Sequence, residues 1–242
     1  MSGHSKWSKV KHQKAATDAV RGKIFTKMSN AIIIAVKQGG GVADPDSNFK
    51  LRLAIDRAKS VNMPKENIMR AIEKAAKSGD SENMSEIVYE AYGPAGVAVL
   101  IKAVTDNKQR TVAEVKNLLE RGGGVLAAQG SVSRLFSQVG LIEIGKEGRT
   151  FDEIFELATE AGAIDIEDTD EAFLVYTDHG ELHKVREFLQ TKVTILSAEL
   201  SFRTEAAVRP DKQETREKIE KLLDAVEDME DVQRVYTNYQ PV

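Results

Sequence analysis

The sequence predicts an α+β fold of three domains: a small helical N-terminal domain followed by two domains that combine helices with strands. Three observations support this prediction. Apolar residues recur at helical spacing in the first third of the chain, the polar segment SGDSENMSE follows, and short strands then alternate with helices in an order that repeats. With 242 residues, of which 41% are hydrophobic, the chain is long enough for two or three domains with buried cores.

The helical domain is predicted to cover residues 1–79. Its first helix runs from Ala15 to Gln38, where apolar residues lie three and four positions apart. Two further amphipathic segments, 47–60 and 65–77, predict the second and third helices. The glycines at 39–41 follow a helix instead of joining a strand to a helix, so they predict helix termination and not a nucleotide-binding loop.

The next part of the chain changes to strands. Residues 86–94, 95–106 and 130–138 predict strands, and 110–124 predicts a helix, which gives the order ββαβ. After these come predicted strands at 140–145, 163–168, 171–177 and 195–203 and predicted helices at 151–163 and 180–191. Their order is βαββαβ, which is the ferredoxin-like order.

The C-terminal part of the chain supplies the helix and the strand that the ββαβ segment lacks for a complete α/β domain. It contains a candidate strand at 206–210, an amphipathic helix at 211–230 and a strand at 232–240. We therefore expect two ferredoxin-like α/β domains, one inserted in the other. Residues 80–139 plus 205–242 would form one domain, and residues 140–204 the inserted one. A linear arrangement of three units agrees with the same pattern almost as well.

Composition excludes several classes of protein. The chain has no cysteine, so disulfides and thiolate zinc sites are excluded. Its N-terminus is polar and basic, and no run approaches the roughly 18 apolar residues of a membrane helix, so we expect a cytoplasmic protein with no membrane partner. There is no GxSxG or HExxH motif, and we expect no catalytic residues, no cofactor and no small-molecule substrate.

A histidine pair and a second run of glycines resemble functional motifs, but structural roles explain both better. His179 and His183 have the i, i+4 spacing of metal ligands, but Gly180 lies between them and favours an exposed helix start, so no metal site is expected. The glycines at 122–124 follow a helix and lack a GK[ST] ending, which again predicts helix termination.

Charge is divided unevenly along the chain. The net charge is −4, yet residues 1–77 hold 16 Lys and Arg against 6 Asp and Glu, whereas residues 78–242 hold 18 against 32. A basic front part joined to an acidic remainder indicates that the front part faces a polyanion.

The basic residues are concentrated between Gly3 and Lys27. The candidate nucleic-acid-binding residues there are Lys6, Trp7, Lys9, Lys11, His12, Lys14, Arg21, Lys23 and Lys27. The cations are spaced to meet successive phosphates, and the tryptophan could stack on an unpaired base. The alternative is a solvated helix face with the tryptophan in the core.

Arg110 is a further candidate, because it lies at a predicted helix N-terminus where N–H groups and a guanidinium suit a phosphate. From spacing alone, simple capping of that helix by Asn107 or Thr111 is the stronger interpretation.

Several long motifs resemble those of the YebC/PmpR family over most of the chain. They are GHSKW, KAATDAVRGKIFTK, DPDSNFKLRLAIDRAKSVNMPKENI, YEAYGPAGVAV, DNKQRTVAEVK and GGGVLAAQGSVSRLF. The resemblance implies a helical domain and two α/β domains, one inserted in the other. It also implies that Lys6, Lys9, Lys11, Lys14, Arg21, Lys23, Lys27 and Arg110 correspond to basic residues of the family, with Trp7 beside them. One departure is at 28–30, where Met, Ser and Asn replace an arginine-bearing turn.

Family members are usually described as probable transcriptional regulators that bind DNA, and some relatives resemble translation factors that act on the ribosome, including at proline-rich stalls. We therefore expect a non-enzymatic regulator of gene expression whose partner is nucleic acid, either DNA or ribosomal RNA, with the ribosome as a further candidate partner. The sequence shows no convincing recognition helix, and its lysine-rich segment suits phosphates more than base edges. The composition of the lysine-rich segment favours RNA as the ligand, whereas the usual family description favours DNA.

Overall fold

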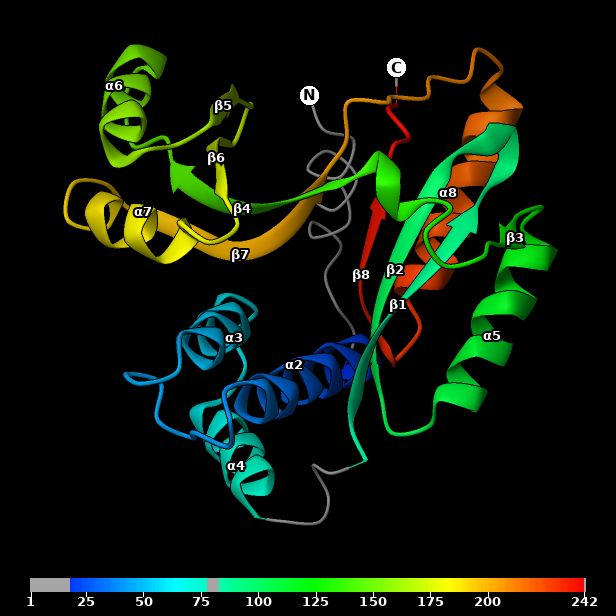
Figure 1. Ribbon diagram of the computed structural model, residues 1–242, viewed down its shortest axis with the longest axis horizontal. Helices are drawn as coiled ribbons and strands as arrows, with labels where there is room; N and C mark the ends of the chain where they lie inside the picture. Colours follow the sequence, from blue (N-terminus) through cyan, green and yellow to red (C-terminus); the bar gives the residue numbers. More distant parts are fainter. Residues whose placement is uncertain (1–17, 78–82, 242) are drawn as a thin grey trace. The chain divides into compact units, whose positions relative to one another are not determined.

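The computed structural model describes residues 18–77 and 83–241, and its α+β architecture confirms the predicted fold class (Figure 1). The chain forms two compact units. One is Ser137–Arg203, which we call the inserted unit. The other contains the described residues 18–77, which we call the helical bundle, together with 83–136 and 204–241, which we call the sheet domain.

The helical bundle consists of α2 (Asp18–Gln38), α3 (Phe49–Ser60) and α4 (Lys65–Ala76). Apolar side chains at helical spacing face each other and form one core, as the sequence pattern predicts. This core includes Met28, Ile32, Val36, Leu51, Ile55, Ala58, Ile68, Ala71 and Ala75. Burial of these faces positions the basic residues on the outside of the bundle.

The glycines that follow α2 end the helix, as predicted. Gly40 and Gly41 have φ of 71° and 83°, the left-handed region that glycine adopts without strain. Gly39 lies so close to Asn48 that a β-carbon there would collide with its side chain. Asn48 caps α3 by accepting from Leu51 N at 3.1 Å, and its amide donates back to Ala35 O at 3.2 Å. The turn therefore fixes α3 against α2.

The sheet domain contains an antiparallel sheet with strand order β3-β1-β2-β8. Its elements are β1 (Ser85–Tyr92), η1 (Pro94–Gly96), β2 (Ala98–Thr105), α5 (Lys108–Arg121), β3 (Val125–Leu126), η2 (Ser133–Leu135), α8 (Gln213–Glu227) and β8 (Val232–Thr237). Apolar side chains of α5 and α8 pack together on one face of this sheet, on which both helices lie (Figure 1).

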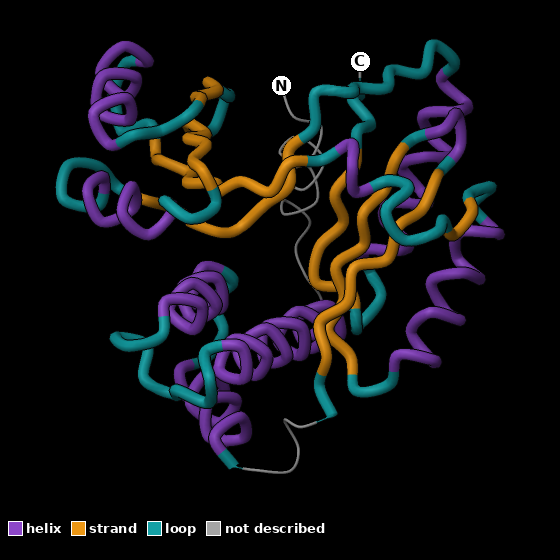
Figure 2. Tube along the Cα trace, viewed as in Figure 1, coloured by secondary structure: helices purple, strands orange, loops and turns teal. Residues whose placement is uncertain are grey.

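The inserted unit has the predicted βαββαβ order. It comprises β4 (Ser137–Gly145), α6 (Phe151–Ala161), β5 (Asp165–Asp168), β6 (Ala172–Asp178), α7 (Leu182–Leu189) and β7 (Ile195–Arg203). Its antiparallel sheet has the order β5-β6-β4-β7, and the strands of both sheets are visible in Figure 2. The helices contribute fully buried residues such as Ile154 and Leu189 to its core.

Two predicted strands are wrong. The strand expected at 130–138 is instead a loop with the short helix η2, followed by the start of β4 at Ser137. The cause is Glu90, whose carboxylate accepts hydrogen bonds from the backbone N–H groups of Gly130, Val132 and Ser133. The candidate strand at 206–210 is reduced to a single bridge between Val208 and Tyr239.

Candidate nucleic-acid interface

Only part of the predicted basic site lies within the described residues. Lys6, Trp7, Lys9, Lys11, His12 and Lys14 lie outside them. Arg21, Lys23 and Lys27 occupy the first half of α2, where Arg21 and Lys23 are exposed. Lys23 and Lys27 are four residues apart and share one face of the helix, whereas Arg21 lies on a different face. The helix therefore presents these charges in two directions.

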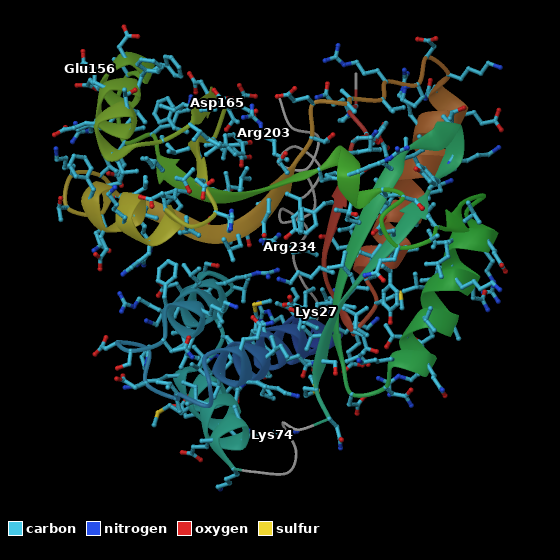
Figure 3. The ribbon with its side chains drawn as sticks, in the orientation of Figure 1. Lys27, Lys74, Glu156, Asp165, Arg203 and Arg234 are labelled. Carbon is cyan, nitrogen blue, oxygen red and sulfur yellow. The ribbon has the colours of Figure 1, made fainter. Side chains whose placement is uncertain are left out.

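Lys27 has an intramolecular hydrogen bond. It is half-buried, and its ammonium donates to the backbone carbonyl of Glu227 at the C-terminal end of α8. The last carbonyls of a helix lack partners in that helix, and its dipole favours a cation there. Lys27 therefore joins the helical bundle to the sheet domain, and Figure 3 shows it beside that domain. Its role toward nucleic acid stays a prediction.

Two more cations of the bundle bind carbonyls of the sheet domain. Lys37 Nζ donates to Met84 O at 2.8 Å, and an Arg57 guanidinium nitrogen donates to Gln233 O at 3.2 Å. Arg52 donates to the carbonyls of Pro45 and Asp46 within the bundle. These bonds hold the cations in place, and the carbonyls themselves carry no net charge.

The structure also shows a cationic face that the sequence analysis did not single out. Arg70 and Lys74 of α4 and Lys77, the residue at its C-cap, are all exposed, and their i, i+4, i+7 spacing is that of one helix face. Lys74 is labelled on α4 in Figure 3. The signal was present in the sequence, because Ile68, Ala71 and Ala75 face the core and leave these positions outward.

Arg110 lies at the N-terminus of α5, and the structure gives it a local role. Asn107 caps the helix by accepting from Arg110 N at 3.0 Å. The Arg110 guanidinium donates to Asp231 and to Asp106, each at 3.0 Å. The hydrogen bond and the charge of Asp231 raise the pKa of Arg110 above its ordinary value. Contact between Arg110 and a phosphate stays a prediction, and it would have to compete with these carboxylates.

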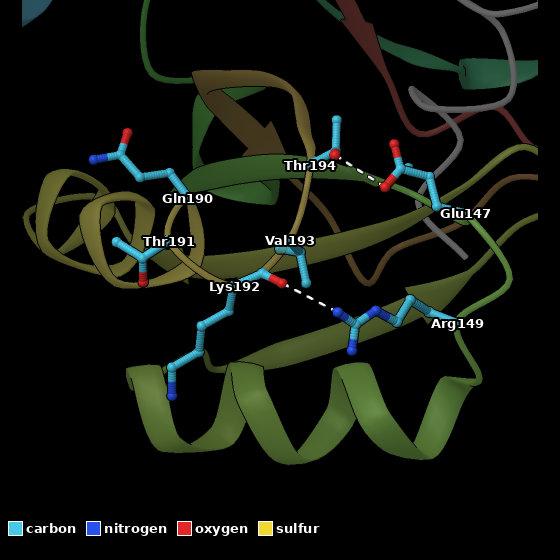
Figure 4. A pocket seen from close by; sticks show the side chains of 8 residues that line it. Glu147, Arg149, Gln190, Thr191, Lys192, Val193 and Thr194 are labelled. Carbon is cyan, nitrogen blue, oxygen red and sulfur yellow. Dashed lines mark hydrogen bonds between the residues drawn. The ribbon is translucent and has the colours of Figure 1, made fainter.

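The inserted unit contains a shallow polar pocket of about 270 Å³, shown in Figure 4. Thr194 donates to Glu147 at 2.9 Å on one side, and Arg149 donates to the carbonyl of Lys192 at 3.2 Å on the other. No serine, cysteine or histidine is among the residues that line the pocket, so it offers neither a serine or cysteine nucleophile nor a histidine base.

The two histidines of the possible metal pair have separate partners. His179 lies 3.5 Å from Asp178, and His183 lies 3.5 Å from Glu187 on α7. Across the described parts of the chain, no three His, Asp or Glu side chains are close enough to hold a metal ion. In the same residues, no helix combines the length and the apolar character needed to cross a bilayer.

Comparison with known proteins identifies the family. Residues 5–78 match the model of the TACO1/YebC protein N-terminal domain, and residues 84–239 match that of the TACO1/YebC second and third domain. The chain is 46% identical over 241 residues to a probable transcriptional regulatory protein of Sulfurihydrogenibium sp., covering 99% of this chain and 95% of that one. A protein of the same description from Latilactobacillus sakei is 47% identical over 239 residues, covering 98% and 97%.

A solved structure is also similar. The crystal structure of a conserved hypothetical protein from Aquifex aeolicus matches with a TM-score of 0.89 and 41% sequence identity, covering 98% of this chain and 97% of that one. The two domain models together span nearly the whole chain, which confirms the resemblance drawn from its motifs. The chain belongs to the TACO1/YebC family.

Proposed function

We propose that this protein is a non-enzymatic, cytoplasmic regulator of gene expression that binds nucleic acid through its basic N-terminal region. The single observation that carries the proposal is the division of charge. Residues 18–77 hold 12 Lys and Arg against 6 Asp and Glu, and the four lysines before them add to the excess. A polyanion is attracted to this region and repelled by the acidic remainder. The names of the relatives support a regulatory role.

The contact surface is inferred to combine residues 6–27 with the outer face of α4. The exposed cations on α2 and α4 are mostly lysines, and two of the bundle's arginines, Arg52 and Arg57, already donate to backbone carbonyls. Lysine offers a point charge that suits phosphates, whereas bidentate reading of bases needs a free arginine fork. The expected binding is therefore dominated by phosphate contacts.

The first candidate ligand is duplex DNA, with a role in transcription, as members of the family are usually described. The lysine-dominated surface favours a second candidate, a ribosomal RNA, with a role in translation at difficult sequences such as proline-rich ones. Folded RNA requires charge, shape and a stacking aromatic more than groove reading. Trp7 is the candidate stacking residue.

Salt dependence of binding tests the interface. Replacing Lys9, Lys11 and Lys14 by Ala should lower the slope of log affinity against log salt by up to about three, and replacing Arg21 and Lys23 by up to about two. The matched control replaces Lys116 and Lys221, two exposed lysines of α5 and α8, and should leave the slope unchanged. If the control variants and the interface variants behave alike, the N-terminal region is not the contact.

The ligand is tested separately. Full-length protein is fractionated with cell extract on a sucrose gradient, and the same protein is titrated with duplexes of different sequence. Co-migration with ribosomes that is lost in the Lys9, Lys11, Lys14 variant supports the translation role. Strong preference for one duplex, without co-migration, supports transcription.

A further inference from the structure

The outer face of α6 in the inserted unit carries two exposed aromatic side chains that touch each other. Phe151 is 38% exposed and Phe155 is 50% exposed, and their ring centroids are 5.9 Å apart. Single apolar residues on a surface need no explanation, but a contacting aromatic pair forms the centre of an apolar patch. Aromatic side chains of this kind supply much of the binding energy at protein interfaces.

The helix that presents this pair is held firmly at both ends. Thr150 and Glu153 form a reciprocal capping box at the N-terminus, and Gly162 ends the helix with φ of 92°, in the left-handed region. On the inner face, Ile154 and Ala158 are fully buried. The aromatic pair is therefore ordered before any partner binds, which lowers the entropic cost of association.

Negative charge surrounds the pair. α6 contains Asp152, Glu153, Glu156 and Glu160 and no Lys or Arg, and the inserted unit as a whole has 15 acidic against 6 basic residues. Glu153 belongs to the capping box and Glu160 accepts from Lys192 at 3.1 Å. Within the described part of the chain, the side chains of Asp152 and Glu156 make no hydrogen bond or ion pair, and Figure 3 shows Glu156 on the outer side of α6.

The chemistry of this face defines its partner. Nucleic acid is repelled by the uncompensated carboxylates, while a cationic partner without apolar side chains would leave both phenyl rings in water. We infer that Phe151 and Phe155, with Asp152 and Glu156 beside them, form a docking surface for a basic, amphipathic segment of another protein. The partner's apolar face covers the phenyl rings, and its Lys or Arg side chains pair with the two carboxylates.

This surface is tested with a fluorescein-labelled amphipathic helical peptide of leucine and lysine, titrated with the full-length protein and followed by fluorescence anisotropy. Phe155→Ala should weaken binding about tenfold, because it removes an aromatic at the centre of the interface. Leu196→Ala is the matched control, since Leu196 is 51% exposed on β7 of the same unit, and it should leave the affinity unchanged. Equal losses in the two variants would overturn the inference.

A charge-matched pair tests the role of the carboxylates. Glu156→Lys should weaken peptide binding more than Glu217→Lys, which makes the same change of charge at an exposed position of α8 in the sheet domain. A peptide of the same composition with its leucines scrambled should bind more weakly than the amphipathic one. If it binds equally well, the attraction is only that of opposite charges and the proposed docking surface is wrong. If Phe155→Ala instead abolishes self-association in sedimentation, the occupant is a second copy of this chain, which also contradicts the inference.

Discussion

The helical bundle and the inserted unit have opposite balances of charge, since residues 18–77 hold 12 Lys and Arg against 6 Asp and Glu, whereas the inserted unit holds 6 against 15. In the bundle, Lys27, Lys37 and Arg57 each donate a hydrogen bond to a backbone carbonyl, and Lys59 lies 3.9 Å from Asp56. In the inserted unit, most of the basic side chains lie against carboxylates. These pairs are Lys146 with Asp168, Lys184 with Glu181, Lys192 with Glu160, and Arg203 with Asp165 and Glu167.

This difference matters for long-range electrostatics. A cation beside a carboxylate contributes little field at a distance, so the sign of the field follows the surplus charge, which is positive for the bundle and negative for the inserted unit. We therefore expect the bundle to attract a polyanion. We expect the inserted unit, with its surplus of carboxylates, to attract a cationic partner.

The largest effect on stability is expected from substitutions in the two hydrophobic cores. They test whether the helical bundle and the inserted unit unfold as separate cooperative units. Ile32 in α2 and Ile142 in β4 are both fully buried, and changing either to Ala should cost about 2–5 kcal/mol of stability. Hydrogen exchange measured by mass spectrometry should show faster exchange only in the unit that carries the change. Nucleic-acid affinity should fall with Ile32→Ala and not with Ile142→Ala. Equal loosening of both units by Ile142→Ala would contradict the separation.

The next largest effect on stability is expected from Glu90, which holds the loop that leads from the sheet domain into the inserted unit. Glu90 is buried and accepts three backbone hydrogen bonds at 2.6 to 3.0 Å, so Glu90→Gln should cost about 1–3 kcal/mol. Glu86→Gln on the same strand is the control, because Glu86 is half-exposed beside Lys102 and its loss should cost at most about 1 kcal/mol. Denaturant unfolding measures both.

The same carboxylate predicts a dependence of stability on pH. Burial alone would raise the pKa of Glu90, but the N–H groups of Gly130, Val132 and Ser133 outweigh it and hold the pKa below the ordinary value of 4.5. Since the folded pKa is depressed, the stabilisation is complete above about pH 4.5 and is lost as the pH falls through the folded pKa. Glu90→Gln should show a shallower acid loss than the wild type, and identical acid profiles would contradict this role.

Substitution of Arg203 tests whether the ion pairs of the inserted unit contribute to its stability. Its guanidinium lies 4.4 Å from the centre of the Tyr176 ring and bonds to Asp165 and Glu167, so Arg203→Ala should cost about 1–2 kcal/mol. Arg203→Lys should recover part of this loss. Lys184→Ala removes a more exposed pair with Glu181 and should have almost no effect on the unfolding midpoint. Equal effects would show that Arg203 behaves like any surface cation.

The smallest expected effect separates a structural lysine from a binding lysine on α2. Lys27→Ala should cost about 0.3–1 kcal/mol, because a cation is lost from the C-terminus of α8. Lys23→Ala should leave the stability unchanged and lower the salt slope of nucleic-acid binding by about one. The two readouts are denaturant unfolding and anisotropy at several salt concentrations. If Lys23→Ala destabilises the protein as much as Lys27→Ala, the proposed division of roles is wrong.

Local patterns predicted most of the fold. Helical spacing of apolar residues identified α2, α3 and α4, and the strand predicted at 195–203 coincides with β7. The prediction failed at 130–138 because Glu90, forty residues earlier in the chain, takes the N–H groups that a strand would need. No pattern inside that segment records the position of a distant carboxylate.

The candidate site was predictable to a smaller extent. The surplus of basic residues is a property of the sequence, and so is the outward face formed by Arg70, Lys74 and Lys77, which follows from helical spacing alone. Two partners could not be predicted, Glu227 for Lys27 and Asp231 for Arg110, since both lie more than a hundred residues away in the chain.

By itself, the amino-acid order determined where most helices and strands form, where glycines end helices and which part of the chain is cationic. These properties depend on neighbours within a few residues, through helical and strand periodicity and through charge. Only the tertiary structure decided which cations bind a carbonyl or a carboxylate in a distant part of the chain, as Lys27 and Arg110 do. The physical reason is that such bonds form between segments brought together by the path of the whole chain.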